Sequence, residues 1–277
     1  MAETNTPTYE RTVPRVLLCA PTFFEVSYVI NPWMTDHVHD TTTERSRRQW
    51  DALRETIARH ADVVLQPPVE RLPDMTFAAN AGLVFGNVFV PSRFRYSQRQ
   101  GEEAHARAFF QRHGFDIVDL PDGMFFEGAG DALFDRGTAR RLWMGHGHRS
   151  DLAAAGELAK RLDIEVVPLK LADPRFYHLD TCFCPLAQGY TLYSPAAFDA
   201  ASLASIERHV PPGLRISVDE HDAVEFACNA VNLGRVVILN RASEKLRSRP
   251  EGAGFMPIAA ALDELMKSGR ASRCSAF

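Results

Sequence analysis

The chain has 277 residues, of which 45% are hydrophobic and 24% are charged, and these proportions are typical of a globular protein. The net charge of −4 and a pI near 6.2 give no reason to expect nucleic acid or an anionic membrane as a partner. No apolar run approaches the length of a membrane span, and the N-terminal residues lack the apolar core of a signal peptide. We therefore expect a cytoplasmic protein.

The first part of the chain predicts one strand, one helix and a second strand after a flexible N-terminal tail. The helix is amphipathic, with Trp50, Leu53 and Ile57 on one stripe and charged residues elsewhere. The expected boundaries are residues 1–14 for the tail, 15–20 for the first strand, 41–60 for the helix and 61–65 for the second strand.

From residue 82 onward, a unit of two hairpin strands, a helix and a further strand recurs at a period of roughly 50 residues. The order of the elements repeats rather than the sequence. Glycine marks several hairpin turns, as in Gly86-Asn87 and Gly234-Arg235. We expect hairpins at residues 82–91, 132–144, 182–193 and 227–239, helices at 101–113, 151–162, 196–209 and 258–267, and closing strands at 115–120, 164–169 and 214–218.

These four units account for the chain if the opening strand, helix and strand supply a fifth, and no linker rich in Gly, Ser or Pro divides them. We therefore predict one domain over residues 15–277. Units repeated at this period are typical of closed arrays and solenoids. Periodicity alone leaves an ordinary α/β sandwich with a mixed sheet as the alternative.

Polar residues interrupt the apolar runs at equivalent places. Asn80, Glu127 and His178 each follow a strand and its loop and precede the hairpin of their unit. Equivalent loops of a closed array converge at one end of its axis, so these side chains are expected to share a site. Residues 125–134 read FFEGAGDALF and place Glu127 and Asp131 among glycines and apolar residues, where a carboxylate needs a cation or hydrogen bonds.

His178 and Asp180 are two residues apart, so their side chains face the same side of an extended segment, and histidine is the usual acid or base at neutral pH. Cys274 is the candidate nucleophile, and the adjacent Arg273 could lower its pKa. Its rival is Cys228, whose apolar neighbours favour a thiol in the core. The sequence pattern around Cys274 also fits a free surface thiol.

The five cysteines are odd in number and mostly lie in apolar, strand-like sequence, which argues against a disulfide framework. Cys182 and Cys184 are too few ligands for a structural metal, and no Cys or His pair accompanies them at the usual spacing. We therefore predict neither a metal nor a cofactor. One cysteine, one histidine and several acids suggest attack by a thiolate on a planar carbon, and the acids favour a cation such as a guanidinium.

The motifs around these residues resemble the guanidino-group-modifying superfamily of arginine deiminases, dimethylarginine dimethylaminohydrolases, amidinotransferases and arginine dihydrolases. Phe-x-x-Asn is followed by Glu-Gly-x-x-Asp, His-Leu-Asp-Thr and a C-terminal cysteine, and the resemblance begins near Cys19. FFEGAGD and HLDTCF are the most specific segments, while VINPWM and MTFAANAGLVFGN are most similar to the bacterial arginine dihydrolases. The resemblance implies a five-bladed α/β propeller, the pentein fold, with pseudo-fivefold symmetry.

The resemblance also implies roles for individual residues in catalysis. Cys274 is similar to the nucleophile and His178 to the general acid and base. Glu127 is similar to the acid that holds the guanidinium and orients the histidine. Asn80 stands where deiminases and dimethylarginine hydrolases usually have aspartate.

The other expected site residues bind the substrate or support the site. Asp180 matches the second acid that binds the guanidinium, and Arg99 and Arg149 resemble the pair that binds the α-carboxylate. Phe77 resembles the apolar wall of the pocket, and Asp131 is expected to support the Glu127 loop. The predicted partner is a small guanidino compound, arginine or an analogue, and the sequence is compatible with a homodimer.

The asparagine at position 80 bears on the product. A carboxylate only accepts hydrogen bonds, whereas the amide of Asn80 also donates and can tolerate both arginine and the neutral ureido group of citrulline. The sequence thus favours an arginine dihydrolase, which gives ornithine, carbon dioxide and ammonia. The alternatives are a single-step hydrolase that makes citrulline from arginine or a methylated arginine, an amidinotransferase, and a catalytically silent arginine-binding protein. The C-terminal SGRASRCSAF lacks the glycine pair that usually precedes the cysteine of this superfamily, which is the argument for the silent protein.

Overall fold

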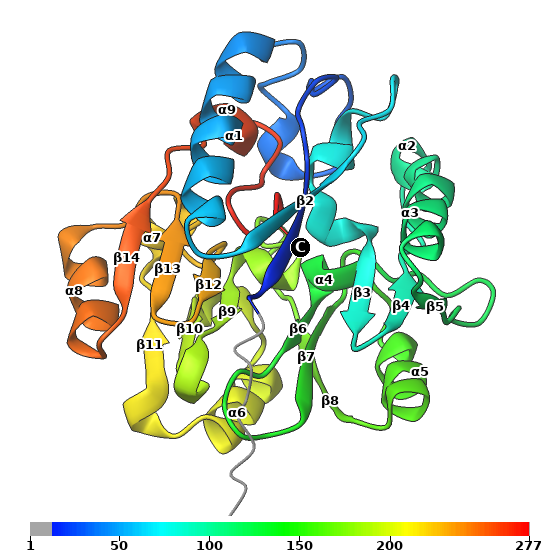
Figure 1. Cartoon of the computed structure of the whole chain (residues 1–277). Coiled ribbons are helices and arrows are strands. Elements are labelled where there is room, and N and C mark those ends of the chain that lie inside the picture. The colour runs from blue at the N-terminus through cyan, green and yellow to red at the C-terminus, as the bar shows by residue number, and fades with distance from the viewer. Residues whose placement is uncertain (1–12, 277) are drawn as a thin grey trace, which may run out of the picture.

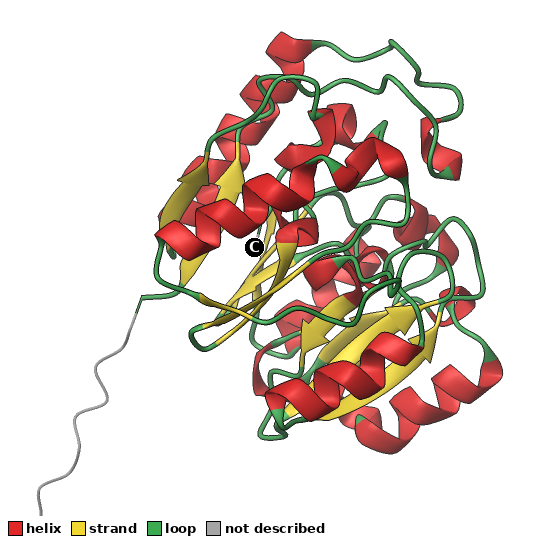
Figure 2. Cartoon of the chain, turned by 90° about the vertical axis from the view of Figure 1, so that its right-hand side faces the viewer, coloured by secondary structure: helices red, strands yellow, loops and turns green. Residues whose placement is uncertain are grey.

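The computed structural model of the protein describes residues 13–276, so most of the predicted N-terminal tail lies outside the described residues. Five small sheets surround the centre of the molecule, and the described part of the chain ends near that centre (Figure 1). The longer helices lie on the outside of the ring, and the view in Figure 2 also shows them flanking the strands. The arrangement confirms the predicted five-bladed α/β propeller.

The first blade is the simplest, because its sheet has two strands. Strand β1 (Arg15–Cys19) pairs in parallel with β2 (Asp62–Gln66), and helix α1 (Thr43–Ala58) connects them. Trp50, Leu53 and Ile57 of α1 are buried, as the amphipathic pattern predicts.

Each of the other four blades has an antiparallel hairpin whose second strand pairs in parallel with a third strand. A helix connects the second and third strands. The blades are β3 (Gly82–Phe85), β4 (Val88–Pro91), α3 (Glu102–Arg112) and β5 (Asp116–Ile117); β6 (Ala132–Phe134), β7 (Arg141–His146), α5 (Ala153–Leu162) and β8 (Glu165–Lys170); β9 (Phe183–Pro185), β10 (Thr191–Tyr193), α6 (Ala200–His209) and β11 (Arg215–Ser217); and β12 (Val231–Leu233), β13 (Val236–Leu239), α8 (Glu244–Gly252) and β14 (Met256–Ala259).

Short helices occupy some of the connections between these elements. They are α2 (Ser97–Gln100), α4 (Gly128–Asp131), α7 (Glu220–Val224) and α9 (Asp263–Met266), together with single 3₁₀ turns such as η3 (Ala78–Ala81) and η4 (Leu179–Thr181). None of the helices within residues 13–276 is long and apolar enough to cross a membrane.

The prediction for the last blade is wrong in one respect. Residues 258–267 do not form a helix, because they contain the end of strand β14 and the single turn α9. The helix of this blade is α8, which begins after the N-cap Ser243 and has Pro250 in its last turn. That proline breaks the helical pattern in the sequence. Pro257 is tolerated in β14 because this strand lies at the edge of its sheet and pairs only with β13.

Candidate active site

The predicted polar residues lie in turns that directly precede the inner hairpins. The side chains of Asn80, Glu127 and His178 are all fully buried, with 0% exposure. Asn80 lies within η3, Glu127 is the residue before α4, and His178 is the residue before η4. The turn α4 packs against both η3 and η4, so the three loops meet as the repeat predicts.

Gly130 explains how closely these loops approach one another. A Cβ atom at this position would overlap the Asn80 Nδ2 atom and would lie 3.5 Å from the ring of His178. Only glycine therefore fits between the two side chains, which accounts for one of the glycines in FFEGAGDALF.

His178 and Glu127 form a hydrogen-bonded pair. The His178 Nε2 atom lies 2.7 Å from Glu127 Oε2, and Arg149 Nη1 donates to the same carboxylate oxygen at 3.1 Å. Burial would raise the pKa of Glu127, but the Arg149 charge and the His178 hydrogen bond outweigh it and hold that pKa well below its usual value. Burial lowers the pKa of His178 to about 3, although Glu127 acts in the opposite direction. The ring is therefore neutral at physiological pH.

The proton on Nε2 determines what the other ring nitrogen can do. Because the Glu127 carboxylate only accepts, Nε2–H is the donor, which leaves His178 Nδ1 with its lone pair. Nδ1 is buried and has no hydrogen-bond partner among the described residues. It is the atom that can accept a proton.

Asp131 supports both loops rather than facing a ligand. Its Oδ2 atom accepts from Ser150 Oγ at 2.6 Å, and that hydroxyl oxygen accepts from the backbone N–H of Glu127 at 2.9 Å. Its Oδ1 atom accepts from the backbone N–H of Leu179 at 3.0 Å. The geometry therefore fits the supporting role expected for Asp131 better than direct contact with a substrate.

Cys274 is fully buried and lies beside Asp180. The thiol donates to Asp180 Oδ2 at 3.0 Å and accepts from Asn229 Nδ2 at 3.1 Å. Burial and the Asp180 carboxylate raise the pKa of the Cys274 thiol well above its usual value. Burial also raises the pKa of Asp180, to about 6. Cys274 is therefore not a surface thiol, and it is protonated in the free protein.

Asn229 is the residue that the sequence reasoning missed. Its Oδ1 atom accepts from the backbone N–H groups of Ala271, Arg273 and Cys274 at 3.1, 3.0 and 3.2 Å, and its amide also donates to the Asp180 carbonyl at 2.9 Å. One amide thus fixes the C-terminal loop and the thiol. A signal was present, because FACNA at residues 226–230 repeats FAANA at residues 77–81, with Asn229 equivalent to Asn80.

Arg99 does not present a free guanidinium. It makes a bidentate pair with Glu102, at 2.8 Å from Nε and 2.7 Å from Nη2, and Nη1 donates to Asn80 Oδ1 at 2.8 Å. Its Nη2 atom also donates to the Asp74 carbonyl at 3.1 Å. Arg99 thus orients Asn80 in this structure, and its contact with a substrate carboxylate stays a prediction.

Arg149 is also engaged inside the protein. Besides Glu127, its guanidinium donates to the Ile30 carbonyl at 2.8 Å and lies 4.7 Å from the ring centroids of Tyr96 and Tyr177. The predicted pair of carboxylate-binding arginines is thus held in internal contacts. Phe77, the expected apolar wall, is 1% exposed, and the Arg270 guanidinium lies 4.4 Å from its ring centroid.

Buried polar atoms without partners gather around this centre. They share full burial and the lack of a hydrogen bond within residues 13–276, which in native proteins marks a place for water or a ligand. They include Asp74 Oδ1, Asn80 Nδ2, His178 Nδ1, Asp180 Oδ1, Ser272 Oγ, and Nε and Nη2 of Arg270, whereas Arg270 Nη1 lies 2.9 Å from Asp74 Oδ2 as an ion pair. The set contains both donors and acceptors, so a polar molecule could satisfy it.

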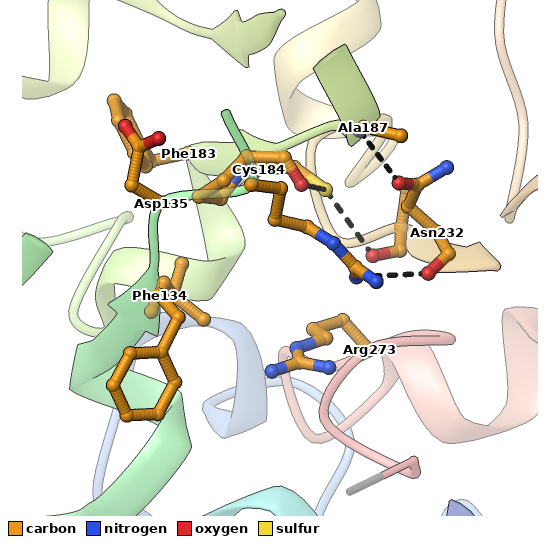
Figure 3. Close-up of a pocket in the computed structure, with 11 residues that line it drawn as sticks. Phe134, Asp135, Phe183, Cys184, Ala187, Asn232 and Arg273 are labelled. Atoms are coloured by element: carbon orange, nitrogen blue, oxygen red, sulfur yellow. Dashed lines mark hydrogen bonds between the residues drawn. The ribbon is translucent and has the colours of Figure 1, made fainter. Parts of the chain in front are cut away.

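A separate pocket of about 500 Å³ has none of the predicted site residues in its lining (Figure 3). Arg273 and Asn232 line it, with Cys184. Several of its polar groups already pair with one another, since Arg136 donates to the Asn232 carbonyl at 2.8 Å and the Cys184 thiol to the Ala230 carbonyl at 3.3 Å. The predicted catalytic residues Cys274 and His178 therefore lie outside the lining of this pocket.

Comparison with known proteins agrees with this arrangement. Residues 28–277 match the family described as N,N dimethylarginine dimethylhydrolase, eukaryotic. The chain is 51% identical over 260 residues to the bifunctional arginine dihydrolase/ornithine cyclodeaminase ArgZ of Synechocystis sp., covering 94% of this chain but 37% of that protein. It is 35% identical to the N(G),N(G)-dimethylarginine dimethylaminohydrolase of Mycobacterium tuberculosis, covering 94% and 84% of the two chains.

A solved structure is similar over nearly the whole chain. The N-terminal domain of ArgZ, crystallised as a cysteine-to-serine variant with its substrate, superposes with a TM-score of 0.94 at 50% identity, covering 95% of this chain and 97% of that domain. The present chain spans a little over a third of the bifunctional relatives, 37% of each. It belongs to the dimethylarginine dimethylaminohydrolase family, and within it is similar to the cyanobacterial arginine dihydrolases.

Proposed function

We propose that this protein is an arginine dihydrolase, with residues 15–277 as a single catalytic domain. Arginine and two waters give ornithine, carbon dioxide and two molecules of ammonia. The observation that carries the proposal is the orientation of the Asn80 amide. Because Arg99 Nη1 can only donate a hydrogen bond, the Asn80 Oδ1 atom faces Arg99. The Asn80 Nδ2 atom is then a buried donor without a partner among the described residues. Such a donor suits the carbonyl oxygen of a ureido group. Two relatives with 51% and 49% identity are named as arginine dihydrolases.

The charges around Cys274 support a cationic substrate. Arg99 pairs with Glu102, Arg149 with Glu127, and Arg270 with Asp74. Asp180 has no cationic side chain within ion-pair distance among the described residues, and its Oδ1 atom lacks a partner. A planar guanidinium can donate to Asp180 and Glu127 from two sides, which places its central carbon near the thiol.

The bound cation also activates the nucleophile. It offsets the Asp180 charge that disfavours ionisation, so the Cys274 proton can pass to His178 Nδ1. The thiolate adds to the guanidino carbon, and the protonated His178 donates its proton to the nitrogen that leaves as ammonia. Water, with its proton taken by His178, hydrolyses the thiouronium to citrulline. A second cycle on the ureido group gives ornithine and carbamate, which decomposes to carbon dioxide and ammonia.

Incubation of the purified protein with arginine tests this function directly. Ornithine with about two ammonia per arginine is expected from two cycles. Citrulline with one ammonia would identify a single-step hydrolase, and turnover of methylated arginines alone would identify a dimethylarginine hydrolase. Binding of arginine without any product would identify a catalytically silent arginine-binding protein.

The cytoplasmic location and the homodimer remain predictions from the sequence.

Replacing Asn80 by Asp is expected to stop the reaction at citrulline. The substituted carboxylate cannot donate to the ureido oxygen, so the second attack should slow by about 100-fold or more while the first persists. Product analysis by amino-acid chromatography, with ammonia measured in parallel, separates the two cycles. Asn232→Asp serves as the control, because Asn232 is a buried asparagine that lines the pocket in Figure 3. Ornithine as the sole product of Asn80→Asp would show that the amide has no such role.

Arginine binding is expected to weaken as the pH falls through about 6. Burial raises the pKa of Asp180 to about 6, and only the ionised carboxylate attracts the guanidinium. KM for arginine should therefore rise by about tenfold per pH unit below that value, whereas the charge of the guanidinium does not change in this range. Asp180→Asn should have a high KM and no inflection near pH 6. If the inflection near pH 6 persists in Asp180→Asn, the titration of another group causes it.

A further inference from the structure

Residues of three blades and of the C-terminal loop line the pocket of Figure 3. Its apolar lining includes the buried side chains of Phe183 and Ala230. Arg136 reaches the pocket from the turn between β6 and β7, and Arg273 reaches it from the loop that carries Cys274. Two guanidinium groups from distant parts of the chain therefore line one cavity of about 500 Å³.

The other polar side chains of the lining already have hydrogen-bond partners. The Asp135 carboxylate accepts from two N–H groups, at 2.8 and 3.2 Å. The Asn232 amide accepts from the backbone N–H of Ala187 at 2.8 Å and donates to two carbonyls of its own hairpin, both at 2.9 Å. The Cys184 thiol donates to a backbone carbonyl at 3.3 Å. None of these side chains needs a ligand to satisfy it.

The two guanidinium groups differ from the rest of the lining. Arg136 Nη1 donates to the Asn232 carbonyl at 2.8 Å, but the other nitrogens of Arg136 and the whole Arg273 guanidinium lack a hydrogen bond within residues 13–276. No carboxylate in that range lies within ion-pair distance of either group. Desolvation and the charge of Arg273 both lower the pKa of Arg136, so the two cations disfavour each other. An anion bound between them would relieve this repulsion.

The geometry of the pocket narrows the kind of anion. A guanidinium binds the oxygens of a phosphate or carboxylate in pairs, and two guanidinium groups on different elements suit a tetrahedral dianion better than a planar monoanion. A cavity of about 500 Å³ also lies in the size range of small-molecule sites. The apolar walls at Phe134 and Phe183 can therefore contact an organic group that is attached to the phosphate.

We propose that Arg136 and Arg273 bind a small phosphate dianion, free or as a monoester, at a site separate from the Cys274 centre, and that the bound anion weakens arginine binding. The anion site stands independently of the proposed function. Only its effect on arginine rests on that function.

The effect on arginine follows from the place of Arg273 beside Cys274. Asn229 Oδ1 accepts from the backbone N–H groups of both residues, at 3.0 and 3.2 Å, so one turn carries the anion-binding side chain and the thiol. Burial raises the pKa of Asp180, whereas the charge of Arg273 lowers it. An anion that offsets the Arg273 charge makes Asp180 harder to ionise, and the substrate guanidinium is then attracted less.

Calorimetric titration of the whole chain with inorganic phosphate and with phenyl phosphate, at constant ionic strength, tests the site. Inorganic phosphate should bind with a Kd of about 1 mM or lower. Phenyl phosphate should bind about tenfold more tightly, because its ring can pack against Phe134 and Phe183. Arg136→Gln and Arg273→Gln should each weaken the binding of both compounds by about tenfold or more, because charge-assisted hydrogen bonds are lost.

Arg140→Gln is the matched control for the titration. It removes the same charge from the turn that carries Arg136, but the Arg140 guanidinium lies over the Phe85 ring, at 5.4 Å from its centroid, and is not part of the pocket lining. Phosphate affinity should therefore stay within about twofold of the wild-type value. Circular dichroism establishes that each variant is folded.

Steady-state kinetics with arginine test the effect on the catalytic centre. Saturating phosphate should raise KM for arginine by about fivefold with little change in kcat. In Arg136→Gln the same phosphate concentration should no longer change KM. By reciprocity, arginine should weaken phosphate binding to the wild type by the same factor.

The outcomes separate the site from its effect and from the proposed function. Absence of phosphate binding, or binding that survives both glutamine substitutions, would refute the site. A rise in KM that persists in Arg136→Gln would show that phosphate competes at the Cys274 centre, and an unchanged KM in the wild type would refute the coupling. If arginine is neither bound nor hydrolysed, the proposed function and the coupling both fail, and the titration alone decides the site. Binding of phenyl phosphate alone would assign the site to phosphate monoesters, and equal binding of both compounds would assign it to free phosphate.

Discussion

Cys274→Ser is expected to lower kcat for arginine hydrolysis by about 10⁴-fold or more while arginine binding changes by less than about threefold. The Cys274 thiolate is the group proposed to form the covalent intermediate, and a serine hydroxyl is much harder to ionise. Binding should persist because Asp180 and Glu127, which are proposed to hold the guanidinium, are unchanged. Ammonia release gives kcat, and calorimetric titration with arginine gives the affinity.

Cys228→Ser is the matched control for this experiment. Cys228 is buried like Cys274, and burial raises the pKa of its thiol well above the usual value. It lies in a hydrophobic core cluster, so its loss should reduce stability but leave kcat nearly unchanged. Mass spectrometry of acid-quenched protein should detect the thiouronium adduct on Cys274. Adduct formation on Cys228, or activity in Cys274→Ser, would place the nucleophile elsewhere.

The repeated order of strands and helices was the feature of the sequence that predicted the fold best. Hairpins such as the one that turns at Gly86 have local signals, because Gly86 adopts a φ of +60° that few other residues tolerate. Each blade is built from contacts along a short stretch of chain, so local patterns predict it. The helix of the last blade was predicted wrongly because Pro250 and Pro257 lie inside regular elements. Only pairing with the neighbouring strand β13 explains why β14 is extended.

The site was predictable where a residue keeps its place in the repeat. Asn80, Glu127 and His178 precede their hairpins at equivalent positions, and the fold brings them together. The pairings of their side chains were not predictable, because they join distant residues: His178 and Glu127 are 51 positions apart, and Arg149 and Ile30 are 119 apart. The pairing of Arg99 was open to prediction, since Glu102 lies only three residues away and could have been recognised as its partner.

Asn229→Asp is expected to lower kcat by about 10³-fold and the free energy of unfolding by about 3 kcal/mol. The substitution keeps the shape and the oxygen that accepts from the loop N–H groups, but it replaces the NH₂ donor by a second oxygen. In the native protein, Asn229 Nδ2 donates to Cys274 Sγ at 3.1 Å and to the Asp180 carbonyl at 2.9 Å, and the new oxygen would face both of these acceptors without a proton to donate. A new negative charge beside Asp180 would also raise the pKa of the thiol further.

Asn240→Asp separates the effect on stability from the effect on chemistry. Asn240 is a buried amide of the same blade, where its Nδ2 atom donates to the Glu225 carbonyl at 3.0 Å and its Oδ1 atom accepts from the Leu262 N–H at 2.9 Å. Its replacement should reduce stability by a similar amount, yet kcat of the folded fraction should stay within about threefold of wild type. Urea unfolding and kcat at saturating arginine distinguish the two variants. If both lose stability and activity in the same proportion, Asn229 acts only by holding the C-terminal loop; if Asn229→Asp alone loses kcat, its amide sets the ionisation and position of the thiol.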